Sequence, residues 1–376
     1  MNKTAIALAV AASIAGIGNV SAASMEDRMM AMEKRLKYLE QRLASQDKVI
    51  AEKDKQISEL TGGEESGGAW FQNTEIGGVV EVDYVNSDSD GEDSDDLVTA
   101  TVEVGITTQV NDWVSAELVL LYEEDTDNQS DGDSSFDVDT AMVSIADPDA
   151  NWFINAGQYT LPFGSYSSHM ISDPFTLLHG ETGDTAAEAG YSANGFTVSA
   201  YVFDGDRFDA GGDSADVNNW GAALGYEAET DSFSFVGHLG YINDVLESDE
   251  LSGAGGLQSG RAPGWIASAE VGAGDFTIIG EYLQQTDIAL AGSTDEPSTY
   301  NFEVGYGFDA AGLPATVALG FTGSDEADGL VAEESIRGVF GLEIMDGTSV
   351  AFEYANDEDY DGTDTDTFTG RLGIEF

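Results

Sequence analysis

Histidine is the residue type to weigh first for catalysis, and the chain contains three, His169, His179 and His238. Each could act as a general base in a Ser-His-Asp arrangement. No G-x-S-x-G nucleophile elbow and no His-rich metal spacing accompanies them. The chain also has no cysteine, which removes thiol nucleophiles, thiolate metal sites and disulfides. We therefore expect a protein that is not an enzyme and uses no cofactor.

Two acidic segments match the first six positions of an EF-hand calcium loop. The first reads N-S-D-S-D-G from Asn86 and the second D-E-D-Y-D-G from Asp357. Position twelve is Leu97 in one and Phe368 in the other, where a bidentate Glu is required, so a true EF-hand is excluded. Weak divalent-ion binding and simple solvated acidic loops both remain open. The carboxylates concerned are Asp88, Asp90, Asp357, Asp359 and Asp361.

The charge of the chain is extreme, with a formal net charge of −58, and it is unevenly placed. Residues 1–61 hold nine of the thirteen Lys and Arg, and the rest of the chain has no Lys and only Arg207, Arg261, Arg337 and Arg371. Nucleic acid is excluded as a partner, because phosphate binding needs clustered Lys and Arg. Any solute handled by so acidic a chain should be a cation or a neutral molecule rather than an anion.

One segment, T-L-P-F-G-S-Y-S-S-H-M-I-S-D-P-F-T-L-L-H-G-E-T from Thr160 to Thr182, is far more apolar than the acidic or Gly-rich loops around it. Such a loop needs a surface to cover it. The strand pattern described next predicts a barrel, and we expect this loop to fold into the interior of that barrel and narrow its pore. Packing over a neighbouring loop or a partner subunit is the alternative. Arg337 and Arg371 lie on polar strand faces and could line the pore, although pairing with a nearby carboxylate is favoured for each. The candidate substrate-binding or constriction residues are Tyr159, Phe163, Tyr166, His169, Met170, Asp173, Phe175, His179, Arg337 and Arg371.

The rest of the sequence predicts strands, and the clearest example is the last ten residues, T-F-T-G-R-L-G-I-E-F. Apolar and polar residues alternate strictly there, over about the length of a tilted membrane-spanning strand. The same period of two recurs from Trp70 onward and gives sixteen strands. A strand in lipid needs backbone partners on both sides, which implies a closed barrel. A soluble β-sandwich is the alternative, but the small polar residues of the inner face favour a wet lumen.

Connections between the predicted strands alternate between tight turns and long loops. Turns fall at sites such as Asn111-Asp112 and Asp346-Gly347, and the eight long loops include 86–97, 160–184 and 355–366. Short periplasmic turns, long external loops and an even strand number are typical of outer-membrane barrels. The fold class is therefore an all-β, 16-stranded antiparallel transmembrane barrel of the outer-membrane porin type.

The chain divides into four predicted parts. Residues 1–22 form a signal peptide, 23–61 a periplasmic coiled coil, 62–73 a Gly-rich linker and 74–376 the barrel. The coiled coil rests on a heptad through Met29, Leu36, Leu43, Ile50 and Ile57, and a single amphipathic helix is the alternative. We expect a homo-oligomer, with a trimer preferred by analogy with trimeric porins.

The stretch Gly157 to Thr182 resembles the siderophore porins of the LbtU (legiobactin-uptake) family. The resemblance rests on Gly157-Gln158-Tyr159, Pro162-Phe163-Gly164 and the M-I-S-D-P-F segment from Met170 to Phe175. A coiled coil before a sixteen-strand barrel fits that family too. The resemblance implies an outer-membrane porin that passes iron-loaded siderophores without a plug domain. The P-F-G element also resembles phosphate-selective porins, but those need a ladder of Lys and Arg that this barrel lacks.

Three functions therefore stand side by side. The first is passive uptake of iron-siderophore complexes through a channel narrowed by the third loop. The second is a general cation-preferring diffusion porin, and the third is a structural tether between the outer membrane and the periplasm. In each case the partners are membrane lipid and, for a channel, a small-molecule solute.

Overall fold

The computed structural model describes residues 73–89, 91–124, 136–205, 217–230, 232–252, 256–291 and 293–376. The predicted signal peptide, coiled coil and all but the last residue of the linker lie outside the described residues, as does Asp90. No helix within the described ranges is long and apolar enough to cross a membrane.

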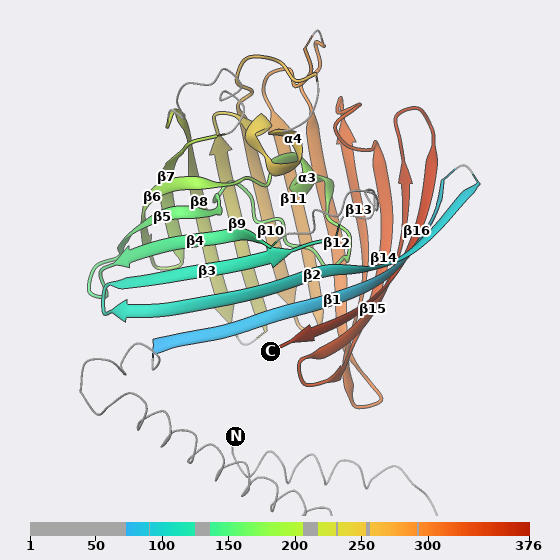
Figure 1. Ribbon diagram of the computed structural model, residues 1–376, viewed down its shortest axis with the longest axis horizontal. Coiled ribbons are helices and arrows are strands. Elements are labelled where there is room, and N and C mark those ends of the chain that lie inside the picture. Colours follow the sequence, from blue (N-terminus) through green and yellow to red (C-terminus); the bar gives the residue numbers. More distant parts are fainter. Residues whose placement is uncertain are drawn as a thin grey trace, which may run out of the picture. The chain divides into compact units, whose positions relative to one another are not determined.

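Sixteen antiparallel strands form one closed barrel, in which every strand pairs with its neighbours in sequence and β1 pairs with β16 (Figure 1). The strands are β1 (Thr74–Ser89), β2 (Glu92–Asn111), β3 (Val114–Tyr122), β4 (Asp137–Ala146), β5 (Trp152–Thr160), β6 (Gly183–Ala193), β7 (Phe196–Phe203), β8 (Asn219–Thr230), β9 (Phe233–Ile242), β10 (Gly264–Ala273), β11 (Phe276–Gln285), β12 (Ser298–Ala310), β13 (Leu313–Asp325), β14 (Glu334–Met345), β15 (Thr348–Glu358) and β16 (Asp364–Glu375). Two short helices, α3 (Phe175–Gly180) and α4 (Asp249–Ser252), and a 3-10 turn, η3 (Val245–Glu247), lie in the connections. The predicted fold class of the barrel is confirmed.

Period-two alternation places apolar side chains on the outside of the barrel. Phe302, Leu319 and Ile336 are 53%, 69% and 58% exposed, as expected for side chains that face lipid. Aromatic pairs lie at both strand ends: Trp220 packs at a tilt against Tyr241 at the loop end, and Phe276 does the same with Tyr306 at the turn end. These two belts match the aromatic girdles of membrane barrels.

The barrel closes where the first strand meets the last. Val79 to Ser89 of β1 pair in register with Thr365 to Glu375 of β16. The terminal Phe376 extends this pairing, since its N–H donates to the Gly78 carbonyl and its own carbonyl accepts from the Gly78 N–H. A Cβ on Gly78 would lie 2.6 Å from the Glu103 carbonyl oxygen and 2.8 Å from the Phe376 ring, so only glycine fits there. The predicted last strand is therefore the closing strand.

The predictions of long loops at 86–97 and 355–366 are wrong. The segment 86–97 is mostly strand, because β1 runs to Ser89 and β2 begins at Glu92. Likewise β15 runs to Glu358 and β16 begins at Asp364, which leaves only a short connection. These strand ends extend past the lipid into water, where both faces are polar. The alternation that marks a membrane strand is absent there, although backbone pairing continues.

Candidate functional site: the third loop inside the barrel

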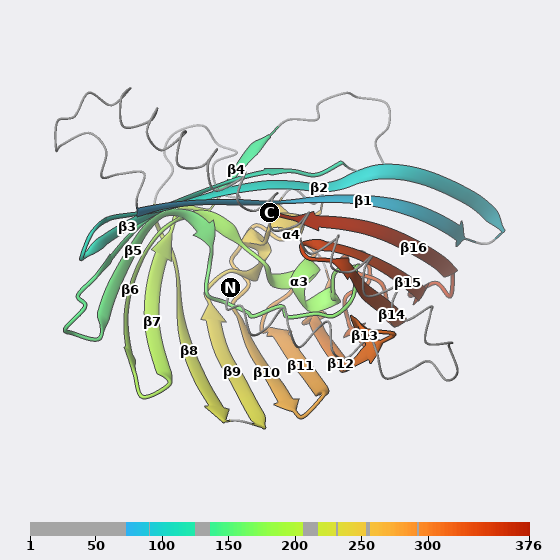
Figure 2. The same ribbon diagram turned by 90° about the horizontal axis from the view of Figure 1, so that it is seen from below.

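The third loop, between β5 and β6, turns inward and follows the inner wall rather than covering the rim. Figure 2 shows α3 within the ring of strands. Hydrogen bonds join this loop to β11, β12, β13, β14 and β15, on the far side of the barrel from β5. The predicted inward fold of the loop is therefore observed.

The first part of the loop is anchored by apolar packing. Leu161 and Phe163 are 1% and 0% exposed. They belong to a cluster formed with Val245 of η3 and with inward-facing side chains of the wall: Tyr159, Ala186, Tyr201, Phe203, Ile242, Ile266 and Leu283. Gly240 of β9 permits the contact, because a Cβ there would lie 1.8 Å from the Phe163 carbonyl oxygen. The start of the loop is therefore held by a hydrophobic cluster near the loop ends of these strands.

Three inward-facing glutamates of the wall accept hydrogen bonds from the loop backbone. Glu281 of β11 accepts from the N–H groups of Ser165 and Tyr166 at 3.3 and 3.2 Å. Glu303 of β12 accepts from the His169 N–H at 2.7 Å and from the Ser168 hydroxyl at 2.7 Å. Such charge-assisted bonds satisfy N–H groups that have no strand or helix partner.

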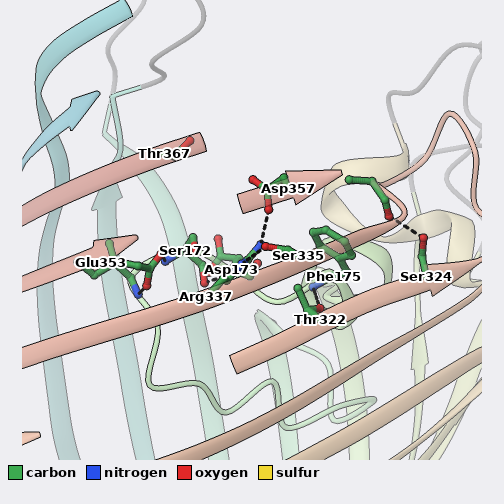
Figure 3. A network of polar contacts seen from close by, with 12 residues as sticks. Ser172, Asp173, Phe175, Thr322, Ser324, Ser335, Arg337, Glu353, Asp357 and Thr367 are labelled. Atoms are coloured by element: carbon green, nitrogen blue, oxygen red, sulfur yellow. Dashed lines mark hydrogen bonds and ion pairs between the residues drawn. The ribbon is translucent and has the colours of Figure 1, made fainter. Parts of the chain in front are cut away.

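The third of these glutamates, Glu353 of β15, holds the next part of the loop. It accepts hydrogen bonds from the N–H groups of Ile171 and Ser172 and from the Ser172 hydroxyl (Figure 3). Its side chain is almost fully buried, so it is shielded from competing water. The loop therefore touches one acidic side chain on each of three wall strands.

Helix α3 ends the inward excursion and packs tightly on the wall. The Phe175 N–H at its start donates to the Thr322 hydroxyl at 2.9 Å. His179 is 1% exposed and lies between Thr299 and Gln285, at 3.3 Å from Nδ1 and 3.2 Å from Nε2. Burial lowers the pKa of His179 to about 4, so the imidazole is neutral at physiological pH. A buried neutral histidine with two hydrogen-bond partners has a packing role.

Several carboxylates lie near Glu181, at the end of the loop. Burial, followed by repulsion from Asp249, Asp173, Asp139 and Glu123, raises the pKa of Glu181 to about 7. The pKa of Asp173 is also raised, because the surrounding protein partly desolvates its carboxyl group, against the opposing effect of Arg337 and Arg371. We call these five residues, Glu123, Asp139, Asp173, Glu181 and Asp249, the acidic group.

A β-bulge brings Asp139 into the acidic group. Val119 pairs with Thr140 and Leu120 with Val138, which leaves Asp139 without a cross-strand partner. A bulge changes the direction of the extra side chain. Asp139 then lies close enough to Glu181 and Asp249 to raise the pKa of both carboxyl groups.

The two candidate arginines are paired with carboxylates, as favoured from the sequence. Arg371 donates from Nε to Asp83 at 2.9 Å, and its Nη1 lies 2.7 Å from Glu81, so it ties β16 to β1. Arg337 lies 3.8 Å from Asp357 through Nη2. Neither guanidinium presents an unpaired charge to an anionic solute.

The candidate residues fall into two sets. Tyr159, Phe163, Phe175, His179 and Arg337 are buried, so in this structure they hold the loop and do not face solvent. Asp173 is exposed, and Tyr166, His169, Met170 and Arg371 are partly exposed. A direct contact with solute is open only to this second set.

The acidic turns differ from their predicted arrangement. Asp88 lies in β1 and accepts from the Gly91 N–H, and Asp357 lies in β15 beside Arg337. Asp361 accepts from the Thr363 N–H, and this hydrogen bonding lowers the pKa of its carboxyl group. Across the described ranges no three His, Asp or Glu side chains are grouped so that they could hold a metal ion.

Sequence reasoning missed Glu281, Glu303 and Glu353. The sequence does place each of them at an inward-facing position of an alternating strand, next to an outward-facing aromatic residue. A long loop inside a barrel must find acceptors for its N–H groups, and a carboxylate on the inner face of a strand can supply them. That signal alone does not say which glutamates meet the loop.

A closed barrel of sixteen antiparallel strands with a loop folded into its lumen has the fold of the outer-membrane porins. Solved structures bear out this class. The outer-membrane channel DcaP of Acinetobacter baumannii has a TM-score of 0.57 at 14% identity, covering 81% of this chain and 97% of that one. OprB of Pseudomonas putida has a TM-score of 0.60 at 10% identity, and the match covers 81% of this chain and 95% of OprB. OmpT of Vibrio cholerae, solved in a trimer form, gives 0.51 at 10% identity, covering 81% and 100%.

Sequence comparison finds more closely related chains. A UPF0422 protein of Coxiella burnetii is 26% identical over 271 residues, which cover 67% of this chain and 57% of that protein. A UPF0422 protein of Legionella pneumophila is 25% identical over 312 residues, which cover 70% of this chain and 55% of that protein. The chain thus spans little more than half the length of these curated relatives. No protein-family model matches the sequence.

Proposed function

We propose that this chain forms a passive outer-membrane channel whose narrowest section is set by the inward-folded third loop. The observation that carries the proposal is the course of that loop, from β5 across to the β11 to β15 wall. A loop fixed across the lumen leaves a smaller opening, bounded on one side by the acidic group. Size and charge at this opening would then select the solute.

The solute class that we propose first is the iron-loaded siderophore, which rests on the resemblance to the LbtU family. The resemblance falls on the residues that form the inward loop, and that loop is the element best placed to contact a solute. The names of the similar UPF0422 proteins state no substrate.

A general cation-preferring porin is the second candidate, and the acidic group favours it. Asp173 and Glu181 belong to the loop and the other three carboxylates of the group act on Glu181 from neighbouring segments, while the two wall arginines are engaged with carboxylates. A negative opening attracts cations and repels anions. The third candidate, a structural tether, needs no conduction at all.

The deciding experiment is conductance of the purified full chain in a planar bilayer. Single-channel current and the reversal potential in a KCl gradient are measured before and after micromolar ferric siderophores are added. Block by a siderophore supports dedicated uptake. Conduction that every siderophore leaves unchanged supports the general porin, and the absence of conduction overturns the channel proposal in favour of the tether.

For the assembly we propose a trimer in the outer membrane, held partly by a periplasmic coiled coil over residues 23–61. The support is the heptad of that segment and the trimer form of the structurally similar OmpT. Chemical crosslinking of the full chain, compared with a variant that lacks residues 23–61, tests both parts. Loss of the trimer only in the shortened variant supports a role for the coiled coil.

A further inference from the structure

The third loop is held in two different ways along its length. Its beginning, through Leu161 and Phe163, is embedded in the apolar cluster. Its tip, residues 167–174, is attached to the wall mainly through hydrogen bonds to charged side chains. The two parts can therefore be loosened independently.

Arg337 of β14 binds the end of the tip and the start of α3. Its Nη1 donates to the carbonyls of Ser172 and Asp173 at 3.1 and 2.6 Å. Its guanidinium carbon lies 5.4 Å from the centre of the Phe175 ring, a cation–π contact, and its Nε donates to the Ser335 hydroxyl at 2.9 Å. Figure 3 shows Arg337 between the loop and Asp357.

Glu353 complements Arg337 on the neighbouring strand. Arg337 is a donor to the carbonyls of residues 172 and 173, while Glu353 is an acceptor for the N–H groups of residues 171 and 172. Between them, the two side chains bind both the carbonyl groups and the N–H groups of one short stretch of backbone. Both are almost fully buried, where charge-assisted hydrogen bonds are strong.

We propose that Arg337 and Glu353 are positioning residues that fix the tip of the third loop over the lumen and thereby set the width and selectivity of the channel. The inference rests on the proposed channel function. When either wall residue is neutralised, the tip, together with Asp173, should detach from the wall. The apolar beginning of the loop and the barrel itself stay in place.

The test begins with Arg337→Gln and Glu353→Gln, each compared with the unaltered chain. A glutamine at 337 lacks the forked pair of donors, and one at 353 lacks the negative charge that attracts two N–H groups. We expect a single-channel conductance larger by roughly twofold and a reduced preference for cations, because the opening widens and Asp173 moves. Glu188→Gln is the matched control, since Glu188 is a buried inner-wall carboxylate that accepts from Asn155.

A removable tether separates positioning from a general loss of structure. Met170 of the tip lies against Gly320 of β13, where a Cβ would be 3.6 Å from the Met170 Cγ. This proximity makes Met170→Cys with Gly320→Cys the pair to crosslink, and the natural chain has no cysteine to compete. In the Arg337→Gln background the oxidised tether should return conductance and selectivity to the unaltered values, and reduction should remove this effect.

Each outcome bears on one of the two proposals. If the unaltered chain does not conduct, the channel proposal fails. If it conducts and the two variants conduct like it, with the folded band retained on unheated gels, the positioning role is overturned. A changed conductance that the oxidised tether does not reverse also overturns it, because the change then arises away from the tip.

Discussion

Glu181 combines a central place in the acidic group with a pKa near neutrality. Burial and the neighbouring Asp249, Asp173, Asp139 and Glu123 raise its pKa to about 7, so the carboxyl group is mostly ionised above pH 7 and mostly neutral below it. The cation preference of the channel should therefore increase as the pH rises from 6 to 8. Reversal potentials in a KCl gradient measure this preference, and Glu181→Gln should flatten the pH dependence. A variant that keeps the full pH dependence would show that other carboxylates control it.

Arg371 illustrates a charged residue whose role is closure of the barrel. It bridges β16 to Asp83 and Glu81 of β1, and Asp83 is 4% exposed. Arg371→Met leaves a buried carboxylate unpaired, which should lower the free energy of unfolding by about 1–3 kcal/mol. The temperature at which the folded band disappears on gels reports the change. The double variant with Asp83→Asn should recover part of the loss, and equal loss in the single and double variants would contradict pairing as the cause.

At the scale of elements, the third loop acts through its tip more than through its whole length. Removing residues 160–182 would also expose the apolar side chains of the cluster, so that deletion mixes two effects. Replacing residues 167–173 with a short Gly-Ser linker keeps Phe163 and α3 in place. We expect larger conductance and loss of any siderophore block. Unchanged currents would mean that the narrowest section lies elsewhere.

The β1–β2 hairpin carries like charges directly opposite one another. Asp88 pairs in register with Asp93 of β2 and with Asp366 of β16. Such pairs repel, and salt screens exposed charges beyond roughly 3 Å at 1 M and 10 Å at 0.1 M. Amide hydrogen exchange near Asp88 should therefore be slower at high salt than at low salt. Asp93→Ser should reduce this salt dependence, and the turn at Ala193 to Phe196, which has no such acidic pair, is an internal control.

For the whole molecule, the net charge of −58 and the acidic opening predict the same behaviour. Monovalent cations should pass more readily than chloride, and phosphate should pass poorly, because no free basic ladder lines the described wall. Measurements with KCl and potassium phosphate at one ionic strength compare the two anions. Anion-selective current would contradict this account of the pore.

The barrel could be derived from the sequence because its signal is local. Each membrane strand must present an apolar face to lipid and pair its backbone on both sides, so alternation reveals the strands and the turns reveal their order. The apolar character of residues 160–182 likewise predicted that this loop folds into the barrel, because its apolar side chains need to be covered. The hairpin extensions at Ser89 and Glu92 escaped notice, since strand pairing in water leaves no alternation.

The residue pattern is enough to predict a sixteen-stranded barrel with an apolar third loop, and the composition is acidic with few basic residues. The wall residues that meet that loop are known only from the folded chain. Ser172 and Glu353 are 181 positions apart, and Ser172 and Arg337 are 165 apart. Contacts of this kind depend on strand order, register and the direction of each side chain around a closed sheet. No short stretch of sequence contains that information, because barrel closure brings together residues that are distant in the chain.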